Sequence, residues 1–414
     1  MPWLCVLAFG PSCAGQALLV RQHAEAGRFE AAVKAAGQDP DLLAEAAAAV
    51  LERGALSRPE QGHRLIAELK GHAAGLRSLH ALAREGDERI SGPAQVALFE
   101  MGEGEEDEVR KLLSSNEPQA RADALSGLRE SEDRPDLLLS MASDPAALVR
   151  RTAALGLASL SFSEMRAAVL RSLAESDPDP LVRAAALRAG PRLGERGEEL
   201  CAKALESDPA EGVRLAAIEG LDAIGTLSPL VRLRSCLGWE ISQITLAAAW
   251  HLAARGEGDA LQIVRAALSA KDGSLRAAAA IAAGQLQGAM TGDLLKSLED
   301  PIAQVRLQAA LSLQRTGADS SSEVESRIKE ALLGISKSDS VEAAIAAGRL
   351  AKSEAEESRQ ALSRLVSHVE PGIRAAAGSA AAEASLWGVA AEGLSDPDPR
   401  VREATAGALL SAVR

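Results

Sequence analysis

The stretch from Ser176 to Gly190, SDPDPLVRAAALRAG, decides the fold of this chain. Its Asp-Pro steps predict a turn into a helix, because Asp caps a helix N-terminus and Pro fits the first turn, where no amide donor is needed. Small residues at helical spacing allow neighbouring helix axes to approach closely. In this helix the predicted buried stripe is formed by Val182, Ala185, Ala186 and Ala189.

The same phrase returns along the chain at intervals of 28 to 36 residues, measured between the residues at the place of its arginine. Thr245 and Glu342 fill two gaps as degenerate copies, and Ser91 marks an earlier copy. Each unit combines a short leucine-bearing helix with an alanine-rich second helix, so one unit has no closed core and must pack on its neighbours. The arginine that anchors the alignment is found at Arg121, Arg150, Arg183, Arg214, Arg276, Arg306, Arg374 and Arg402.

These units resemble the HEAT-repeat family, in particular the short bacterial form also found in phycobilin-lyase-like proteins. The resemblance rests on Asp-Pro, then Val-Arg, then an Ala-Ala-x-x-Leu helix, and it covers residues 73–414. It implies an all-α fold, an armadillo-like α-solenoid of about eleven helix pairs. The Trp/Tyr and Thr-Pro-Leu-His signatures of tetratricopeptide and ankyrin arrays are missing from the array. Residues 15–72 read as a helical hairpin and are expected to form an N-terminal cap.

The resemblance also implies a structural role for the turn aspartates and the anchor arginines. In HEAT repeats these two side chains stack as ladders between neighbouring units. Thr245 and Glu342 supply no such cation, so the ladder is expected to be interrupted there. The ladder role falls on Asp144, Asp177, Asp208, Asp300 and Asp396, paired with Arg150, Arg183, Arg214, Arg306 and Arg402.

The amino-acid composition limits the fold class and the kind of partner. Apolar residues make up 47% of the chain, but aromatic residues only 2%, and tyrosine is absent. Such a composition favours closely packed helices over sheets, which prefer β-branched and aromatic residues. The net charge of −13 argues against nucleic-acid binding, because phosphate neutralisation requires a basic surface. Arginine outnumbers lysine 36 to 9, which is typical of a GC-rich bacterial genome.

Residues 1–14 leave several alternatives open. The apolar run Trp3–Phe9, followed by small residues, fits a signal peptide cleaved after Ala14. Cys13 alternatively fits the lipid-accepting cysteine of a bacterial lipoprotein. The lack of Lys or Arg before the apolar run fits an ordinary first helix instead. Export to the periplasm, lipid anchoring and retention in the cytoplasm therefore all remain open, and no other segment approaches the ~18 apolar residues of a membrane-spanning helix.

No motif of catalysis or cofactor binding is found. The chain lacks HExxH, GxSxG and GxxxxGK[ST], and none of its four cysteines stands at CxxC spacing. None of its six histidines is followed by Glu, whereas His-Glu pairs bind iron in the HEAT-repeat deoxyhypusine hydroxylases. We therefore expect no catalytic residue, no cofactor and no metal site, and not an enzyme.

Variation at one position of the second helix points to a binding surface. The fifth residue after each anchor changes freely, as an exposed or an unconstrained position would. The degenerate unit holds Trp239 and Trp250 beside His251, and tryptophan is enriched at binding hot spots. These rings are equally expected to fill holes in an irregular stack. Arg188 and Glu219 occupy the variable position in neighbouring units.

The leading functional hypothesis is a non-enzymatic scaffold that binds a protein or peptide along one face of the solenoid. The alternative is an accessory subunit or enzyme of the bilin-lyase type, acting on a tetrapyrrole or similar cofactor. An open, mixed-charge groove favours the scaffold, and an apolar pocket ringed by arginines favours the alternative.

Overall fold

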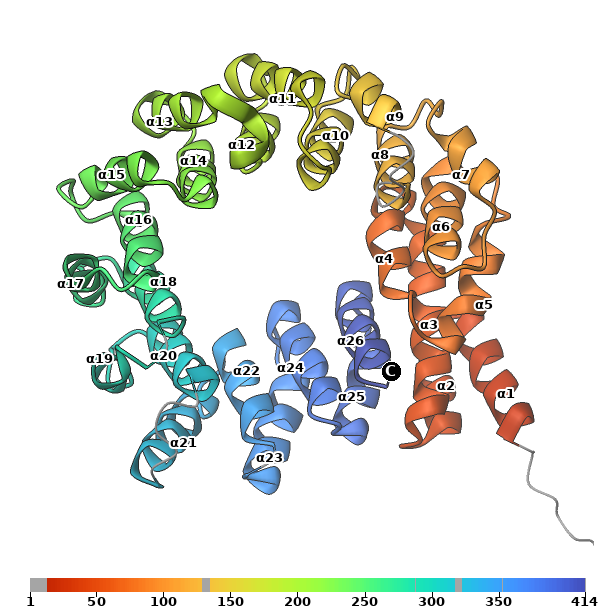
Figure 1. Cartoon of the computed structure of the whole chain (residues 1–414). Coiled ribbons are helices and arrows are strands. Elements are labelled where there is room, and N and C mark those ends of the chain that lie inside the picture. Colours follow the sequence, from red (N-terminus) through yellow and green to blue (C-terminus); the bar gives the residue numbers. More distant parts are fainter. Residues whose placement is uncertain (1–12, 129–134, 287, 317–321, 352, 414) are drawn as a thin grey trace, which may run out of the picture. The chain divides into compact units, whose positions relative to one another are not determined.

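The structure is a computed structural model that describes residues 13–128, 135–286, 288–316, 322–351 and 353–413, with side chains from residue 15. These residues form 26 α-helices, two 3₁₀ helices and no strand (Figure 1). The predicted all-α α-solenoid is confirmed. No helix in the described ranges is long and apolar enough to cross a membrane.

One repeat shows why the sequence folds this way. The first helix, α11 (Glu164–Ser176), ends where the Asp177 N–H bonds to the Leu173 carbonyl. The second helix, α12 (Pro180–Leu187), begins at Asp179, whose carboxylate accepts from two main-chain N–H groups of the first turn, as an N-cap does. The stripe of small residues on α12 is buried, so the turn and the stripe predicted from the sequence lie where expected.

The chain divides into two compact units, Met1–Val109 with Ser336–Arg414 (unit 1) and Arg110–Ile335 (unit 2). This division cuts across the predicted boundaries of cap and array. α7 (Glu106–Leu112) and α21 (Ser322–Ser336) cross the two limits of unit 2. The other α-helices of unit 2 are α8 (Pro118–Gly127), α9 (Pro135–Met141), α10 (Ala147–Ser159), α11, α12, α13 (Gly197–Ser207), α14 (Glu211–Ile224), α15 (Leu227–Cys236), α16 (Gln243–Ala254), α17 (Gly258–Ala267), α18 (Gly273–Ala283), α19 (Thr291–Ser297) and α20 (Ala303–Thr316).

Unit 2 has two layers of helices. The second helices α8, α10, α12, α14, α16, α18 and α20 pack on one another in succession and form the inner layer of its arc. The first helices α9, α11, α13, α15, α17 and α19 form the outer layer (Figure 1). Alternating layers of this kind leave one long face of the second helices open along the array.

Unit 1 brings the N-terminal helices and the last repeats around one apolar core. α3 contacts α1, α4, α5 and also α26, the second helix of the last repeat. A Cβ atom at Gly54 of α3 would lie 2.6 Å from Glu403 Oε1 of α26, so glycine leaves room for this carboxylate. The segment predicted as the N-terminal cap, residues 15–72, thus lies against the last repeat. The α-helices of unit 1 are α1 (Cys13–Glu25), α2 (Phe29–Ala36), α3 (Pro40–Ser57), α4 (Gly62–Glu68), α5 (Ala73–Leu82), α6 (Glu88–Glu100), α22 (Val341–Leu350), α23 (Ala355–Val366), α24 (Pro371–Glu383), α25 (Trp387–Leu394) and α26 (Pro399–Ala412).

The degenerate unit around α22 is shifted by one residue from its predicted alignment. Ser340 caps α22 by accepting from the Ala343 N–H, as Ser242 caps α16 by accepting from the Thr245 N–H. Ala343 is fully buried like Thr245, whereas Glu342 is half-buried. Ala343, and not Glu342, therefore stands at the anchor position. The insertion that precedes this repeat hid the shift in the sequence.

Candidate functional site

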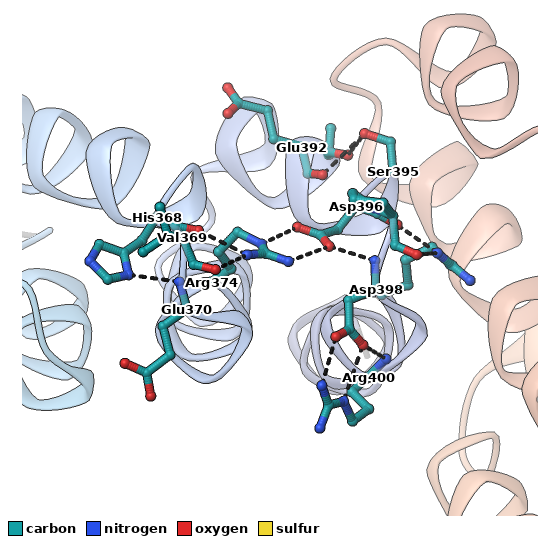
Figure 2. A network of polar contacts seen from close by, with 12 residues as sticks. His368, Val369, Glu370, Arg374, Glu392, Ser395, Asp396, Asp398 and Arg400 are labelled. Carbon is teal, nitrogen blue, oxygen red and sulfur yellow. Dashed lines mark hydrogen bonds and ion pairs between the residues drawn. The ribbon is translucent and has the colours of Figure 1, made fainter.

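Arginine–aspartate pairs join successive units through the turn that precedes each second helix. Arg150 donates from Nε and Nη2 to the carboxylate oxygens of Asp177, at 2.7 and 2.9 Å. Arg183 binds Asp208 in the same way, at 2.9 and 3.0 Å. The side chains of these pairs are 4% to 14% exposed. The same two-point contact recurs in Arg121–Asp144, Arg276–Asp300 and Arg374–Asp396, the last of which is drawn in Figure 2.

Each of these aspartates is therefore bonded by the arginine of the preceding unit. The arginine of its own unit, with which the sequence paired it, reaches the main-chain carbonyl instead. Arg183 Nη1, for example, donates to the Asp177 carbonyl oxygen at 2.9 Å. The predicted ion pairs within one unit are therefore wrong, because in all five the arginine binds the carbonyl oxygen of the aspartate and not its carboxylate. The five pairs are Asp144–Arg150, Asp177–Arg183, Asp208–Arg214, Asp300–Arg306 and Asp396–Arg402.

The reason lies in the position of the arginine on its helix. Side chains lean toward the N-terminus of a helix, so the Nη1 of an anchor arginine lies over the carbonyls of its own turn. The edge formed by Nε and Nη2 is left for the neighbouring unit. Sequence reasoning missed Arg121, Arg276 and Arg374 as members of the ladder. A signal was present, because Asp stands six residues before an anchor only where the preceding anchor is Arg.

Charge and hydrogen bonding fix the protonation of the ladder aspartates. Burial alone would raise the pKa of Asp177, but the bonds from the Arg150 side chain and the Asp179 main chain hold this pKa below its usual value. Asp208 is affected in the same way by burial, Arg183 and the Ala210 N–H. The carboxylates are therefore ionised at neutral pH, and each pair joins two units by charge-assisted bonds.

The ladder is interrupted in the unit that holds α15 and α16. Trp239 stands where the acceptor for Arg214 would be, and Thr245 stands where the next arginine would be. Ala270 in the following unit replaces the aspartate that this arginine would bind. Thr245 Oγ1 instead donates to the Glu240 carbonyl at 2.6 Å, so a bond within the unit replaces the contact between units. The ladder is interrupted in the same way around α22. Lys337 and His368 stand at aspartate positions, and Ala343 stands at the arginine position.

The variable position of the second helices lies on the open face in much of unit 2. Leu155 of α10 and Ile281 of α18 are exposed there, at 41% and 36%. Arg188 and Glu219, also exposed, bind each other across α12 and α14, with 2.5 Å between Nε and Oε2. An exposed pair of this kind contributes little to stability. In the shifted unit the equivalent residue is Gly348, because the predicted Ala347 is fully buried.

Trp250 and His251 form a small cluster on α16 with residues of α14. Their ring centroids lie 4.4 Å apart, at an interplanar angle of 56°. His251 Nδ1 lies 3.0 Å from Asp222 Oδ2, and Arg255 pairs with the other oxygen of the same carboxylate. The indole Nε1 of Trp250 is buried and has no hydrogen-bond partner in the described part of the chain. Packing and the fixed His251 ring therefore position the indole, with no polar contact of its own.

A groove of about 200 Å³ runs beside this cluster, between α16 and α18. Trp250 and Ile281 line it, and they occupy the variable position of neighbouring repeats. The remaining lining residues are apolar or carry amides and include no charged side chain: Leu215, Gln243, Leu246, Ala247, Ala278, Ala282 and Gln285. Trp239, which is 41% exposed in the turn before α16, does not line the groove, so the structure brings together only part of the predicted set.

The remaining candidate groups are the cysteines, the N-terminal segment and possible metal ligands. Cys201 and Cys236 are buried, and burial raises the pKa of Cys201 to about 12 and of Cys236 to about 11, so neither is a reactive thiolate at neutral pH. The side chain of Cys13 and residues 1–12 lie outside the described residues. No group of three His, Cys, Asp or Glu side chains is placed to hold a metal ion in the described ranges.

Comparison with known proteins gave a family match over part of the chain and several similar structures. A model of HEAT repeats matches residues 106–190 and 167–240. No curated protein matches the chain in sequence. The complex of CpcE and CpcF of phycocyanin lyase from Nostoc is similar at 20% identity over 55% of this chain and 93% of that chain, with a TM-score of 0.37. Kap95p from its RanGDP complex shows 14% identity over 94% and 62%, with a TM-score of 0.37. Human deoxyhypusine hydroxylase shows 20% identity over 68% and 96%, with a TM-score of 0.26.

Proposed function

We propose that this α-solenoid, which matches HEAT repeats over residues 106–190 and 167–240, is a scaffold, and not an enzyme, that binds a protein or peptide along the open face of its second helices. The contact region is the part of unit 2 from α14 to α18. The observation that carries the proposal is the groove lined by Trp250 and Ile281, because both lie at the variable position while the buried stripe behind them stays alanine-rich.

The chemistry of the groove suits an apolar side chain of a partner. Tryptophan at the centre of an interface supplies a large apolar area at a small cost in conformational entropy. The amides of Gln243 and Gln285 offer hydrogen bonds at the rim of the groove. The charged groups of Arg188, Glu219 and Arg255 lie on the same series of helices, where they supply orientation more than affinity.

The alternative of a bilin-lyase type of activity requires a pocket for a tetrapyrrole or a similar cofactor. Such ligands occupy pockets of roughly 300–1,000 Å³. The groove beside Trp250 is smaller, at about 200 Å³, and no arginine lines it. These two observations make the groove beside Trp250 better suited to a side chain of a partner than to a cofactor.

Photo-crosslinking in the source organism tests the proposal. A photoreactive amino acid at Ile281 should capture a defined partner protein, which mass spectrometry identifies. The same amino acid at Met165, which is 65% exposed on α11 of the outer layer, is the matched control and should capture none. Equal capture from both positions, or capture from neither, contradicts the proposal.

Substitution of Trp250 then measures the interaction. Trp250→Ala should lower the affinity for the captured partner by about 2 kcal/mol or more, a factor of about 30. Met165→Ala should leave the affinity unchanged. A thermal melt of each variant separates binding from folding, because a ring that served only the core would cost about 3–5 kcal/mol of stability on truncation. Loss of stability without loss of affinity in the folded fraction assigns Trp250 to packing alone.

A further inference from the structure

A second cavity lies in unit 1, between α3 and α26, and arginine dominates its polar lining. Its volume is about 300 Å³. Arg53 and Arg58 come from α3 and the residue after it, and Arg402 and Glu403 come from α26. Phe29, the first residue of α2, completes one side of the cavity. We call it the Arg402 cavity.

Arg402 is an anchor arginine whose ladder contact is incomplete. Its Nη1 donates to the carbonyls of Asp396 and Pro397, at 2.6 and 2.9 Å, as in the other units. Beyond α26 lies α3 and not a further repeat, so no aspartate meets the edge formed by Nε and Nη2. This edge makes no hydrogen bond in the described ranges. In five other units the same edge holds a carboxylate at 2.7 to 3.1 Å, whereas Arg214 and Arg306, like Arg402, keep only their carbonyl contacts.

The charges around the cavity are unbalanced. Glu403 is the acidic residue that lines the cavity, and it pairs with Arg58. Arg53 donates from Nη1 to the Glu25 carbonyl at 2.9 Å. No carboxylate pairs with Arg53 or Arg402 among the described residues. Two guanidinium groups therefore line one cavity with no carboxylate bonded to either; Arg402 is half-buried and Arg53 is exposed.

The surroundings of Arg402 show that this cation is partly shielded. Burial lowers its pKa, the nearby carboxylates of Asp396 and Asp398 raise it, and the like charges of Arg53 and Arg58 lower it further. The guanidinium carbon of Arg402 lies 4.3 Å from the centre of the Phe29 ring, a distance at which the ring face attracts a cation. The ring holds the guanidinium plane in place without occupying its donors.

We propose that the Arg402 cavity binds a carboxylate, held by Nε and Nη2 of Arg402 and by Arg53. The bound group would take the place that the aspartate of a following repeat takes elsewhere in the ladder. The carboxylate belongs either to a free small molecule or to an acidic side chain of another chain. The geometry common to both is the two-point contact of a planar guanidinium with a planar carboxylate.

Calorimetric titration of the full chain at constant ionic strength tests the site. The probes are succinate, the blocked peptide acetyl-Ser-Asp-Pro-amide and inorganic phosphate. The variants are Arg402→Gln and Arg53→Gln. Arg400→Gln on the same helix is the matched control, because the Arg400 side chain is 72% exposed and pairs only with Asp398. Arg306→Gln removes an anchor arginine that lies outside the cavity.

Saturable binding of succinate or of the peptide, weakened about tenfold or more by Arg402→Gln and by Arg53→Gln, supports the proposal. The two controls should keep the affinity of the original chain. Binding of succinate alone identifies a free carboxylate, and tighter binding of the peptide identifies an acidic side chain. Tighter binding of phosphate than of either carboxylate overturns the assigned ligand class.

Absence of saturation, or equal affinity in the original chain and in both cavity variants, overturns the site itself. Arg402→Gln also removes two carbonyl contacts and could weaken the fold, which circular dichroism of the variant reports. Arg53 is exposed on α3 and makes one carbonyl contact, so Arg53→Gln decides the question if the first variant unfolds.

Discussion

Two stretches of unit 2, α10 to α14 and α15 to α18, use the same repeat in different ways. In the first stretch the pairs Arg150–Asp177 and Arg183–Asp208 tie the units of α10, α12 and α14 to one another. In the second stretch Trp239, Thr245 and Ala270 replace the members of these pairs, and bonds within one unit take over. The groove and the half-buried indole of Trp250 occur where the pairs are missing. The fold thus tolerates local loss of its ladder, and the surface there carries the apolar side chains.

The largest expected effect comes from acid, because it removes the charge of all ladder carboxylates together. The pKa values of Asp144, Asp177, Asp208 and Asp300 are held below the ordinary value of about 4. A lowered pKa in the folded state adds stability above the ordinary value, and this stability is lost as pH falls through the folded pKa. Urea midpoints should therefore fall steeply below about pH 4.

Asp177→Asn separates this effect from general acid unfolding. The variant lacks one titrating carboxylate of the ladder, so its urea midpoint should be lower than that of the original chain at pH 7 and should approach it at pH 3. A constant gap between the two midpoints across this range would show that the Arg150–Asp177 pair does not supply the pH dependence.

Truncation of one ladder acid is the next largest effect. Asp177→Ala leaves Arg150 without its carboxylate and removes the acceptor of the Asp179 N–H. Breaking a largely buried pair in this way should cost about 3 kcal/mol in the free energy of unfolding, measured by urea denaturation. The exposed pair at Glu219 gives the contrast, since Glu219→Ala should cost less than about 1 kcal/mol. Equal costs would remove the distinction between ladder and surface pairs.

Truncation of one anchor arginine with a carboxylate partner and of one without it compares the strength of the ladder in the two stretches. Arg183→Ala removes a two-point ion pair to Asp208 and the carbonyl contacts, and should cost about 2 kcal/mol. Arg214→Ala removes only the carbonyl contacts, because Trp239 stands in place of its acceptor, and should cost about 1 kcal/mol or less. Thermal melting of both variants under one condition gives the ranking. The reverse order would place the strength of the ladder in its carbonyl contacts.

The smallest expected effect is a gain. Thr245→Arg together with Ala270→Asp rebuilds the missing pair in the interrupted stretch. Each single substitution adds an unpaired charge, so the two changes should be favourable only together, by about 1 kcal/mol in a double-mutant cycle. A coupling energy of zero would mean that the interrupted units no longer stack at the distance the ladder requires.

The sequence predicted the repeat, its helices and the buried alanine stripe, because period, caps and small residues are local signals. The register of the ladder was wrong. Each ladder aspartate lies six residues before the arginine of its own unit, so spacing alone suggested that partner, whereas the direction of the side chain assigns it to the preceding unit. Glu342 was taken for the anchor in place of Ala343, because buried alanines of a degenerate unit look alike in sequence. Trp250 was expected either at a binding surface or as a filler of the core. It is half-buried and lines the groove, so it has features of both.

The packing of α3 against α26 had no signal in the sequence, since nothing local relates residues so far apart. It also has a consequence for synthesis. Arg58 and Glu403, which bond across this contact, are separated by 345 positions. Closing a chain segment of that length is slow, and chains emerge from the ribosome N-terminus first. The repeats of unit 2 can stack as they emerge, whereas the apolar face of α3 must wait for the last helix to be made. The early helices are therefore the part of the nascent chain most exposed to aggregation and most in need of a chaperone.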